Sequence, residues 1–392
     1  MSGTRVTLLG STGSIGTQGL QVISAHPDRF EVVAISGGSN ITLLAEQAAR
    51  HRPAVVAAAA GTVEELAAAV AAAAEEAGAG GYAPELLVGT DAATEVAGRP
   101  TDVVLNGITG AIGLRPTLAA LGSGARLALA NKESLIIGGP VVRAAAAPGQ
   151  IVPVDSEHSA IAQALRAGRP EEVRKLVVTA SGGPFRGMDR DRLRTVTPEA
   201  ALKHPNFAMG RVITTNSATL VNKGLELIEA HLLFDVPMDR IEAVVHPQQI
   251  IHSMVEFHDG AVVAQLGLPT MLAPIALGLS WPERLADVET PVDWTKAADW
   301  RFEPLDDEAF PAVRLAQQVG EAGGTHPAVY NAANEVGVDA FHEGGCGFLD
   351  IVDTIAEVLG RHDDARFDAH TVDGVLTADA WAREEAARVL SD

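Results

Sequence analysis

The chain of 392 residues contains a single cysteine, Cys346, and only 4% aromatic residues. One cysteine cannot form an intrachain disulfide or build a cysteine-based zinc site, and such usage is typical of a reducing compartment. No basic region followed by a long apolar run is found at the start of the sequence, so no signal peptide is expected. We therefore expect a cytoplasmic protein.

Positive charge is also scarce. The sequence has 29 lysine and arginine residues against 50 aspartate and glutamate residues, a formal net charge of −21. No basic stripe or tail offsets this charge, and such a surface repels nucleic acid and anionic lipid. We expect no nucleic-acid partner, whereas a few local cations in one cleft would still admit a small anionic substrate.

Long apolar runs are nearly absent. One uncharged segment, residues 260–282, approaches the length of a membrane span, but it contains Gly267, Pro269, Pro274 and Gly278. These residues favour a buried strand, a turn and a short buried helix over a membrane helix, so we expect no membrane partner.

Short apolar runs alternate with helical segments over residues 1–150, which is typical of a doubly wound parallel sheet. We predict an α/β chain with an N-terminal Rossmann-like domain over these residues. Polar motifs between strand-like runs predict a central α+β catalytic domain over 151–280. A proline-punctuated linker is expected over 281–310, and helical periodicity predicts a C-terminal helical bundle over 311–392. The strands expected in the first domain are Val6–Leu9, Val32–Ile35, Val55–Ala57, Leu86–Val88, Val103–Leu105, Arg126–Ala128 and Ile151–Pro153.

A glycine-rich turn follows the first expected strand. Residues 10–16 read Gly-Ser-Thr-Gly-Ser-Ile-Gly. Glycine is needed where the backbone turns tightly and a pyrophosphate approaches, and the amides that begin the next helix point at the phosphates. The glycine pattern alone is also compatible with a chance turn, but its position between a strand and a helix favours a dinucleotide site.

The end of the second expected strand distinguishes the two nicotinamide cofactors. NADH enzymes usually carry Asp or Glu there to bind the ribose 2′-hydroxyl. This chain instead has Ser36-Gly37-Gly38-Ser39-Asn40, without a carboxylate that would repel a 2′-phosphate. We therefore predict NADPH; the alternative is a plain turn, since no arginine or lysine marks a phosphate site.

Two carboxylates follow the strand-like run that ends at Pro153. In an extended chain, Asp155 and Glu157 point to the same side and offer oxygen ligands suited to Mg²⁺ or Mn²⁺. The alternative is a helix start with acidic residues in its first turn.

A second polar group is expected on a helix from Ser217 to Leu233. Asn222 and Glu226 are four residues apart and Lys223 is three before Glu226, so the three share one face. The alternative is a surface ion pair, but apolar residues account for the packing face of this helix, which favours a polar face toward a cleft.

Two loops are suited to an anion. Ser181-Gly182-Gly183 follows a strand-like run, and its small residues let backbone amides reach a phosphate. Asn131-Lys132-Glu133-Ser134 follows a strand of the nucleotide domain, where such sheets bind ligands. Residues 204–210 are predicted to form a lid loop.

Together these segments resemble the 1-deoxy-D-xylulose 5-phosphate reductoisomerase family. The resemblance is carried, in order, by GSTGSIGTQ (10–18), NKESLI (131–136), PVDSEHSAI (153–161), SGGPF (181–185), HPNFAMG (204–210), residues 216–230, HPQQIIHSMV (246–255) and NAANE (331–335). It implies an NADPH- and metal-dependent oxidoreductase of non-mevalonate isoprenoid biosynthesis, which rearranges 1-deoxy-D-xylulose 5-phosphate and reduces the resulting aldehyde to 2-C-methyl-D-erythritol 4-phosphate. It also implies a homodimer.

The resemblance further implies a role for individual residues. The metal, Mg²⁺ or Mn²⁺ with Co²⁺ as a further candidate, would be held by Asp155, Glu157 and Glu226. The small phosphorylated sugar would contact Lys132, Ser156, Glu157, Ser181, His204, Ser217, Asn222, Lys223 and Glu226, and the expected catalytic residues are Lys132, Glu157, His204 and Glu226. NADPH would contact Thr12, Gly13, Ser14, Ile15, Gly38, Ser39, Asn40, Asn131, Glu133 and Gly210.

Several positions depart from the family pattern. Phe207 stands where the family commonly has tryptophan, and Gln249 where it usually has serine. Ser39 lowers the positive charge near the 2′-phosphate, and the segment around Thr270 and Leu272 lacks familiar charged residues. The expected metal and phosphate residues are intact, so we expect activity to be retained.

Two other functions are compatible with parts of the pattern. A semialdehyde or homoserine-type dehydrogenase has the same domain order, but a semialdehyde dehydrogenase needs a cysteine nucleophile. Cys346 lies among glycines in the C-terminal helical region and is a poor candidate. A regulator that senses NADPH without turnover would bind the dinucleotide but would not need the three carboxylates together with two anion loops.

Overall fold

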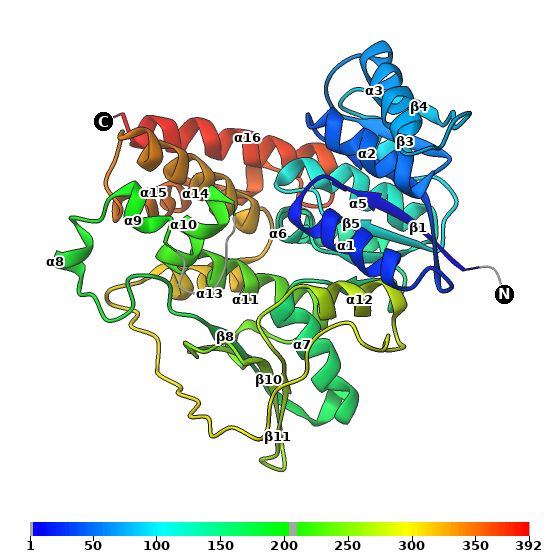
Figure 1. Cartoon of the computed structure of the whole chain (residues 1–392). Coiled ribbons are helices and arrows are strands. Elements are labelled where there is room, and N and C mark those ends of the chain that lie inside the picture. Colours follow the sequence, from blue (N-terminus) through cyan, green and yellow to red (C-terminus); the bar gives the residue numbers. More distant parts are fainter. Residues whose placement is uncertain (1–2, 204–209, 392) are drawn as a thin grey trace. The chain divides into compact units, whose positions relative to one another are not determined.

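The computed structural model describes residues 3–203 and 210–391 (Figure 1). The chain divides into two compact units. Unit 1 comprises Met1–Ser134, Ala144–Ser159 and Thr270–Thr290, and unit 2 comprises Leu135–Arg143, Ala160–Pro269 and Pro291–Asp392. The predicted boundaries at residues 150 and 280 do not coincide with these units, because the helix α12 (Leu272–Ser280) packs within unit 1, against β6 and α1.

Unit 1 is built on a seven-stranded sheet with the order β4-β3-β2-β1-β5-β6-β7. Every neighbouring pair is parallel, so the predicted doubly wound sheet is confirmed. The order reverses between β1 and β5, and ligands of such sheets bind beside this reversal at the carboxyl ends of the strands. The strands are β1 (Thr4–Leu9), β2 (Phe30–Gly37), β3 (Val55–Ala58), β4 (Glu85–Val88), β5 (Val103–Asn106), β6 (Arg126–Leu129) and β7 (Ile151–Pro153), as expected from the seven apolar runs.

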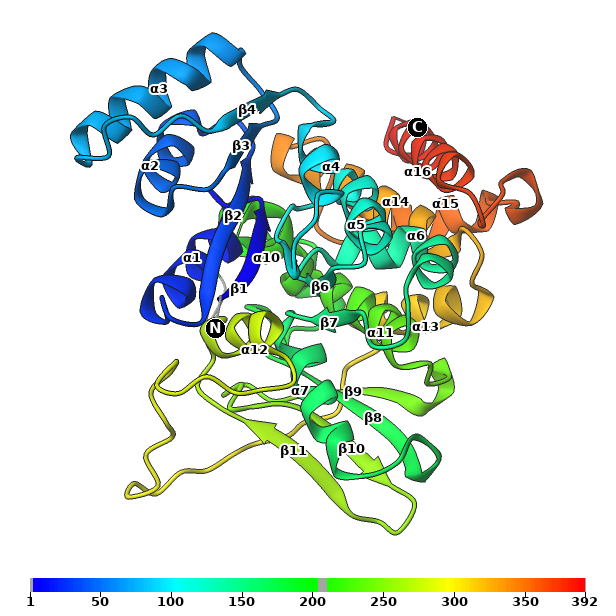
Figure 2. The same cartoon turned by 90° about the vertical axis from the view of Figure 1, so that its right-hand side faces the viewer.

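Helices cover both faces of this sheet, which explains why its strands are continuous apolar runs rather than alternating ones. Figure 2 shows α2 on one side of β2 and β3, and α4 and α5 on the other. The alanine-rich segment forms α3, where Thr62 and Glu65 form a reciprocal capping box at the first turn. The helices of this part are α1 (Ser14–Ala25), α2 (Ile41–His51), α3 (Val63–Glu76), α4 (Ala92–Ala97), α5 (Leu114–Gly122) and the first residues of α6 (Lys132–Ala145).

Unit 2 contains a four-stranded mixed sheet with the order β11-β10-β8-β9. β8 and β9 are parallel, and the other two pairs are antiparallel. The uncharged segment 260–282 forms a strand, β11, then a turn and the buried helix α12, as predicted. The predicted burial of the strand was wrong, because β11 is an edge strand with partly exposed side chains. No helix in the described part of the chain is long and apolar enough to cross a membrane. The strands are β8 (Val173–Ala180), β9 (Ile241–Val245), β10 (Ile251–Phe257) and β11 (Val262–Leu266).

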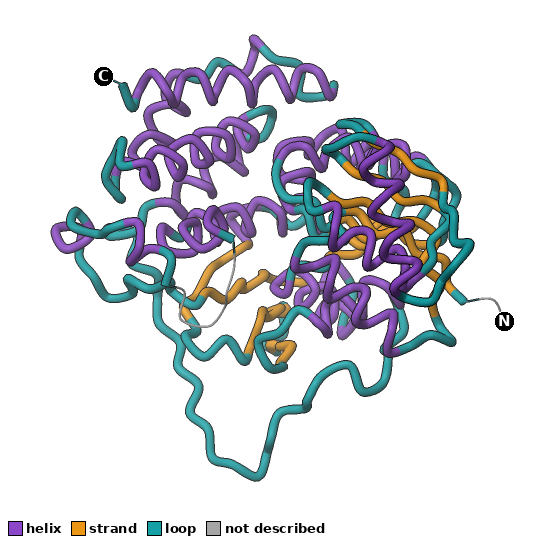
Figure 3. The backbone as a smooth tube through the Cα atoms, turned by 45° about the horizontal axis from the view of Figure 1, so that its top comes forward, coloured by secondary structure: helices purple, strands orange, loops and turns teal. Residues whose placement is uncertain are grey.

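The helices of unit 2 pack into one apolar core with this sheet (Figure 3). α11 contacts β8 and β9 on one side and α13 on the other, and α14 lies against α15 and α16. Residues 281–311, where a linker was predicted, form a long loop with an isolated bridge from Glu303 to Val245. The helices are α7 (Ser156–Ala164, begun in unit 1), α8 (Arg190–Leu193), α9 (Pro198–Ala201), α10 (Arg211–Thr219), α11 (Val221–Phe234), α13 (Ala312–Ala322), α14 (His326–Glu343), α15 (Asp350–Arg361) and α16 (Val372–Val389).

The single helix predicted from Ser217 to Leu233 was wrong, because the chain breaks at Leu220. Leu220 has a φ of 61° and separates α10 from α11. The hydroxyl of Thr219 accepts from the Val221 amide and bonds to backbone carbonyls of its own helix, which offers the backbone an alternative to the helical ladder. The Leu220 side chain is buried in the core, so tertiary packing overrides local helix propensity here.

Candidate active site

The residues predicted to bind the dinucleotide lie at one edge of the seven-stranded sheet. The segments 10–15, 38–40 and 131–133 directly follow β1, β2 and β6. The carboxyl ends of parallel strands meet at the same edge, so the fold of unit 1 brings these three segments to one side.

The turn after β1 is a cradle that admits no side chain at two of its glycines. Gly10 has a φ of 73°, and a Cβ on it would lie 2.8 Å from the carbonyl oxygen of Gly107. A Cβ on Gly16 would lie 2.3 Å from the Gly10 carbonyl oxygen. Gly13 caps the N-terminus of α1 and is exposed, as is Ser14. The Gly13 amide donates to the Gly10 carbonyl at 3.0 Å and closes the turn. The amides that begin α1 follow directly, and a helix N-terminus beside a tight glycine turn fits a pyrophosphate.

Gln47, which the sequence did not single out, supports this turn from α2. Its Nε2 donates to the Ser11 carbonyl at 2.9 Å, and its side chain is buried. A polar residue at a core-facing position of a helix is the sequence signal that could have identified it.

The segment after β2 contains the N-cap residue of α2 and two exposed residues beside open space. Asn40 Oδ1 accepts from the Leu43 amide at 3.1 Å and caps α2, so the plain-turn interpretation explains this residue. Gly38 and Ser39 are exposed, and a Cβ on Gly38 would meet no heavy atom within 4 Å. There is room beside the backbone for a phosphate, and no carboxylate in the segment would repel one.

Asn131 organises the loop after β6. Its Oδ1 accepts from the Ser134 amide at 3.1 Å and from the Ser134 hydroxyl. Its Nδ2 donates to the Gly110 carbonyl at 3.2 Å and to Glu133 Oε2 at 2.8 Å. The buried amide thus fixes the start of α6 and the orientation of Glu133.

The carboxylates at the end of β7 lie at a helix start and not in an extended chain. Glu157 is in the first turn of α7, so the extended-chain prediction was wrong and the helix-start alternative describes the backbone. Ser156 donates its amide to Asp155 Oδ1 at 3.0 Å and its hydroxyl to Glu157 Oε2 at 2.6 Å. Lys132 Nζ lies 2.8 Å from Asp155 Oδ2. Residues that follow β6 and β7 thus form one charged cluster.

His158 is a further member of this cluster to which the sequence assigned no role. Its ring is fully buried, and its Nδ1 lies 3.8 Å from Asp155 Oδ2. It stands one helical turn after Asp155, which places both side chains on the same side of the chain.

In unit 2 the predicted polar face of α11 is confirmed. Asn222 and Lys223 both donate to the Glu226 carboxylate. Lys223 is 4% exposed and Glu226 is 1% exposed, which excludes a surface ion pair. Buried charges require such pairing because an isolated carboxylate away from water is strongly disfavoured.

The predicted phosphate loop contacts the end of α10. Gly182 and Gly183 have φ values of 83° and 67°, a conformation that turns successive amides the same way. Ser181 Oγ accepts from the Gly183 amide at 3.1 Å. A Cβ on Gly183 would lie 2.6 Å from the Ser217 carbonyl oxygen, so the loop and Ser217 are in direct contact.

The predicted lid falls mostly outside the described residues, as do His204 and Phe207. Gly210 is described: it is exposed and precedes α10, and its carbonyl accepts from the Thr214 amide at 3.0 Å.

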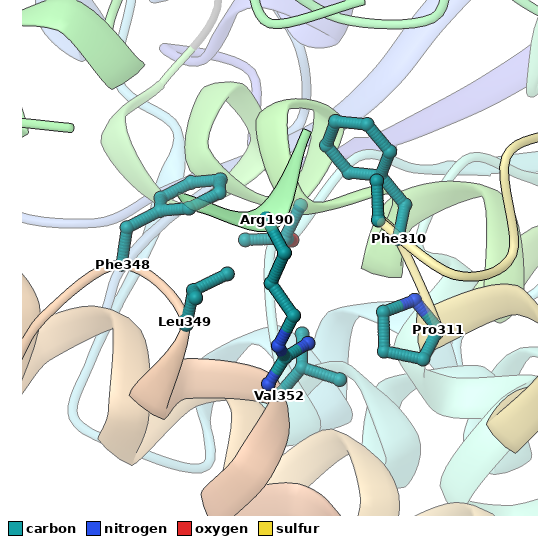
Figure 4. Close-up of a pocket in the computed structure, with 8 residues that line it drawn as sticks. Arg190, Phe310, Pro311, Phe348, Leu349 and Val352 are labelled. Carbon is teal, nitrogen blue, oxygen red and sulfur yellow. The ribbon is translucent and has the colours of Figure 1, made fainter. Parts of the chain in front are cut away.

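A small pocket elsewhere in unit 2 contains none of the predicted site residues. Arg190 lies between Phe310 and Pro311 on one side and Phe348 and Leu349 on the other (Figure 4). The guanidinium of Arg190 binds both carboxylate oxygens of Asp353 at 2.9 Å, so its charge is already balanced.

Cys346 is unsuited to nucleophilic catalysis. Burial, with a smaller contribution from the charge of Asp350, raises the pKa of its thiol to about 11. Because the thiolate is the reactive form, the raised pKa of this thiol argues against the cysteine-dependent dehydrogenase considered above.

Comparison with known proteins identifies the family. Family models described as 1-deoxy-D-xylulose 5-phosphate reductoisomerase match residues 6–139, and models of its C-terminal domains match residues 151–234 and 266–385. The chain is 59% identical over 380 residues to the 1-deoxy-D-xylulose 5-phosphate reductoisomerase of Paenarthrobacter aurescens (strain TC1), covering 97% of this chain and 96% of that protein. The chain belongs to the 1-deoxy-D-xylulose 5-phosphate reductoisomerase family.

Other members of this reductoisomerase family extend the likeness. The Kitasatospora griseola enzyme is 59% identical over 386 residues, covering 97% of this chain and 98% of that protein. The reductoisomerase structure from Zymomonas mobilis in complex with NADPH has a TM-score of 0.89 at 39% identity and covers 99% of both chains. A reductoisomerase structure with NADPH, fosmidomycin and magnesium has a TM-score of 0.90 at 33% identity, covering 99% of this chain and 98% of that one.

Proposed function

We propose that this protein converts 1-deoxy-D-xylulose 5-phosphate to 2-C-methyl-D-erythritol 4-phosphate, with NADPH as reductant and a divalent metal ion. The observation that carries the proposal is the identity of 59% with a named reductoisomerase over 97% of the chain. The carboxylates and anion-binding residues of the sequence prediction are all present in the chain. Asp155, Glu157 and Glu226 take part in the hydrogen bonds and ion pairs described above.

NADPH binding is assigned to the carboxyl edge of the seven-stranded sheet. The glycine turn after β1 would hold the pyrophosphate on the amides that begin α1, those of Ser14 and Ile15, with Thr12 and Gly13 beside it. Gly38, Ser39 and Asn40 would surround the 2′-phosphate, with Ser39 donating a hydroxyl hydrogen bond. Asn131, through the loop that it organises, and Glu133 and Gly210 complete the assigned contacts.

The metal is assigned to Asp155, Glu157 and Glu226, whose oxygens suit Mg²⁺ or Mn²⁺, with Co²⁺ as a further candidate. A bound divalent ion supplies Lewis acidity toward the substrate's carbonyl and hydroxyl oxygens. Ser156 orients the Glu157 carboxylate by its 2.6 Å hydrogen bond, and Lys132 holds Asp155. Glu226 belongs to unit 2. Its assignment as a metal ligand is supported by the family resemblance.

The substrate phosphate is assigned to unit 2. Ser181 and Ser217 belong to two segments in direct contact, and each offers a hydroxyl donor. Asn222 and Lys223 add an amide and a buried ammonium from the first turn of α11. This donor set suits a phosphate dianion, since hydrogen bonds with an ionised partner are the stronger ones. Ser156, Lys132 and His204 are assigned to the sugar portion of the substrate.

We further propose that the protein works as a homodimer, as the family resemblance implies, and that it lies in the cytoplasm, as its single cysteine indicates. Sedimentation at micromolar concentration would yield the mass of two chains, and a monomer of full activity would contradict this part of the proposal.

The test is the loss of NADPH absorbance on adding 1-deoxy-D-xylulose 5-phosphate, with and without Mg²⁺ or Mn²⁺. Loss that requires both substrate and metal is expected, and 2-C-methyl-D-erythritol 4-phosphate should accumulate in equal amount. NADPH binding without any turnover would refute the proposal and favour a dinucleotide sensor.

The variant Glu226→Gln tests the metal assignment. It keeps the size of the side chain but removes its charge and one of its two acceptor oxygens, so turnover should be abolished while NADPH affinity stays nearly unchanged. Turnover near the wild-type rate at saturating metal would show that Glu226 does not hold the ion.

A further inference from the structure

The buried amide of Asn334 in α14 makes a single connection to α10. Its Nδ2 donates to Asn216 Oδ1 at 3.0 Å. Asn334 is fully buried, and within the described part of the chain its Oδ1 has no hydrogen-bond partner. Burying an amide with an unpaired acceptor is costly compared with an apolar side chain of the same shape. Packing of α14 therefore does not explain why this position carries asparagine.

The other polar residues of the same NAANE segment have a different partner. Asn331 Nδ2 donates to Glu335 Oε1 at 3.0 Å, and Glu335 Oε2 lies 2.7 Å from Nη2 of Arg383 in α16. Asn331 and Glu335 thus belong to the contact between α14 and α16. Asn334 is separate from this network, since its partner belongs to α10.

Two more contacts join α10 to α14, which lie side by side in Figure 1. The hydroxyl of Thr215 donates to the Arg211 carbonyl, so it accepts from His342 Nε2 at 2.7 Å. Arg211 pairs with Asp339 near the start of α10. The Asn334 bond is the one nearest the end of α10, where Ser217 meets the loop of Ser181 and Gly183.

The Asn334 bond reaches the last turn of α10. The helix stops at Thr219, and Leu220 turns out of the helical conformation. The last carbonyls of a helix lack helical partners. Here the Thr219 hydroxyl and the Leu220 amide donate to carbonyls of this turn, and the Asn334 amide ties the turn to a second helix. Asn216 and Ser217 lie in this final turn.

We propose that Asn334 is a positioning residue for phosphate recognition. By holding Asn216 it fixes the last turn of α10, so that the Ser217 hydroxyl keeps its spacing from Ser181 and from the amide of Gly183. This inference rests on the proposed function, which assigns Ser181 and Ser217 to the substrate phosphate. Asn334 acts on substrate binding through Asn216 and touches no reacting atom.

The test is Asn334→Leu, which keeps the number and branching of the side-chain heavy atoms but removes both the donor and the acceptor. The KM for 1-deoxy-D-xylulose 5-phosphate should rise about tenfold or more, and inhibition by inorganic phosphate should weaken by a similar factor. The KM for NADPH should stay unchanged. The unfolding midpoint is measured alongside to establish that the variant is folded, because the substitution removes one unpaired acceptor but leaves Asn216 Oδ1 without its donor. Asn331→Leu is the matched control, a buried asparagine of the same helix, and its substrate KM should equal that of the wild type.

A double-mutant cycle that combines Asn334→Leu with Asn216→Leu measures whether the two substitutions act on substrate binding together or independently. If Asn334 acts through Asn216, the second substitution adds little to the first. Additive effects would overturn the inference, as would an unchanged substrate KM in folded Asn334→Leu or equal KM changes in both asparagine variants.

Direct calorimetry with inorganic phosphate separates this inference from the proposed function. A protein that binds phosphate but never turns over substrate refutes the function alone, whereas equal phosphate affinity in wild type and Asn334→Leu refutes the inference alone.

Discussion

Gly183 and Ser217 approach so closely that a Cβ on the glycine would lie 2.6 Å from the serine's carbonyl oxygen. The two residues are more than thirty positions apart in the sequence. Their contact joins the loop after β8 to the end of α10, and it brings together two hydroxyl donors assigned to one phosphate. The absence of a side chain at residue 183 is therefore a condition for the site.

Gly183→Ala should weaken substrate binding more than it weakens the fold. The added methyl group pushes the loop away from α10, so the KM for 1-deoxy-D-xylulose 5-phosphate should rise while the KM for NADPH stays the same. Gly187→Ala is the control: it has a similar φ of 77° but would meet no heavy atom within 4 Å. Both variants bear the backbone strain of about 1–2 kcal/mol, so equal kinetic effects would show that the contact with Ser217 is irrelevant.

Gly16→Ala tests whether the glycine turn after β1 can still form. Gly38→Ala tests whether NADPH occupies the open space beside residue 38. A methyl group on Gly16 collides with the Gly10 backbone, so both the unfolding midpoint and NADPH affinity should fall. A methyl group on Gly38 meets nothing within 4 Å, so stability should change by less than about 0.5 kcal/mol. Fluorescence titration should nevertheless show weaker NADPH binding to Gly38→Ala, because the cofactor is assigned to that open space. Unchanged affinity would place the adenosine ribose elsewhere.

Stability should decrease on acidification, partly through His362. Burial, with a smaller contribution from His326, lowers the pKa of His362 below its usual value, although Asp364 acts in the opposite direction. Its Nε2 donates to Thr325 Oγ1 at 3.0 Å, while its Nδ1 is buried without a partner among the described residues. A proton on Nδ1 would therefore be an unpaired buried charge.

The direction of this pH dependence follows from the number of protons that the folded and unfolded states bind. The unfolded chain protonates near pH 6.5, above the folded pKa, so it binds more protons in this window and stability rises with pH. Urea unfolding should give a smaller free energy at about pH 5.5 than at about pH 7.5. His362→Gln should reduce this difference, and an unchanged pH dependence in the variant would exclude His362 as a source.

Cys346 should react slowly and be dispensable for turnover. With a thiol pKa of about 11, its alkylation rate at neutral pH should be low and should rise about tenfold per pH unit below that value. Cys346→Ser should keep the wild-type kcat. Loss of activity in a folded serine variant would revive the cysteine-dependent dehydrogenase.

Much of unit 1 could be predicted from local pattern. The seven apolar runs each became a strand, because residues buried on both faces of a parallel sheet show their burial directly as continuous apolar sequence. The shared face of Asn222, Lys223 and Glu226 was equally predictable, since helical spacing alone places them together. The glycine turn followed from its position between a strand and a helix.

Two local predictions failed. Glu157 lies in a helix and not in an extended chain, which is the second of two conformations that the local sequence allowed. Leu220 interrupts what reads as one continuous helix, because the Thr219 hydroxyl competes for backbone bonds and the Leu220 side chain is buried in the core.

By itself, the sequence determined the family, the parallel sheet and the residue types available for NADPH, metal and phosphate, because these depend on short motifs and local periodicity. Only the tertiary structure decided that residue 183 must lack a side chain beside Ser217, that Gln47 supports the glycine turn, and that Asn334 reaches Asn216. Each of these contacts joins segments separated by tens of residues. Their geometry arises when whole elements pack against one another, and no local pattern specifies it.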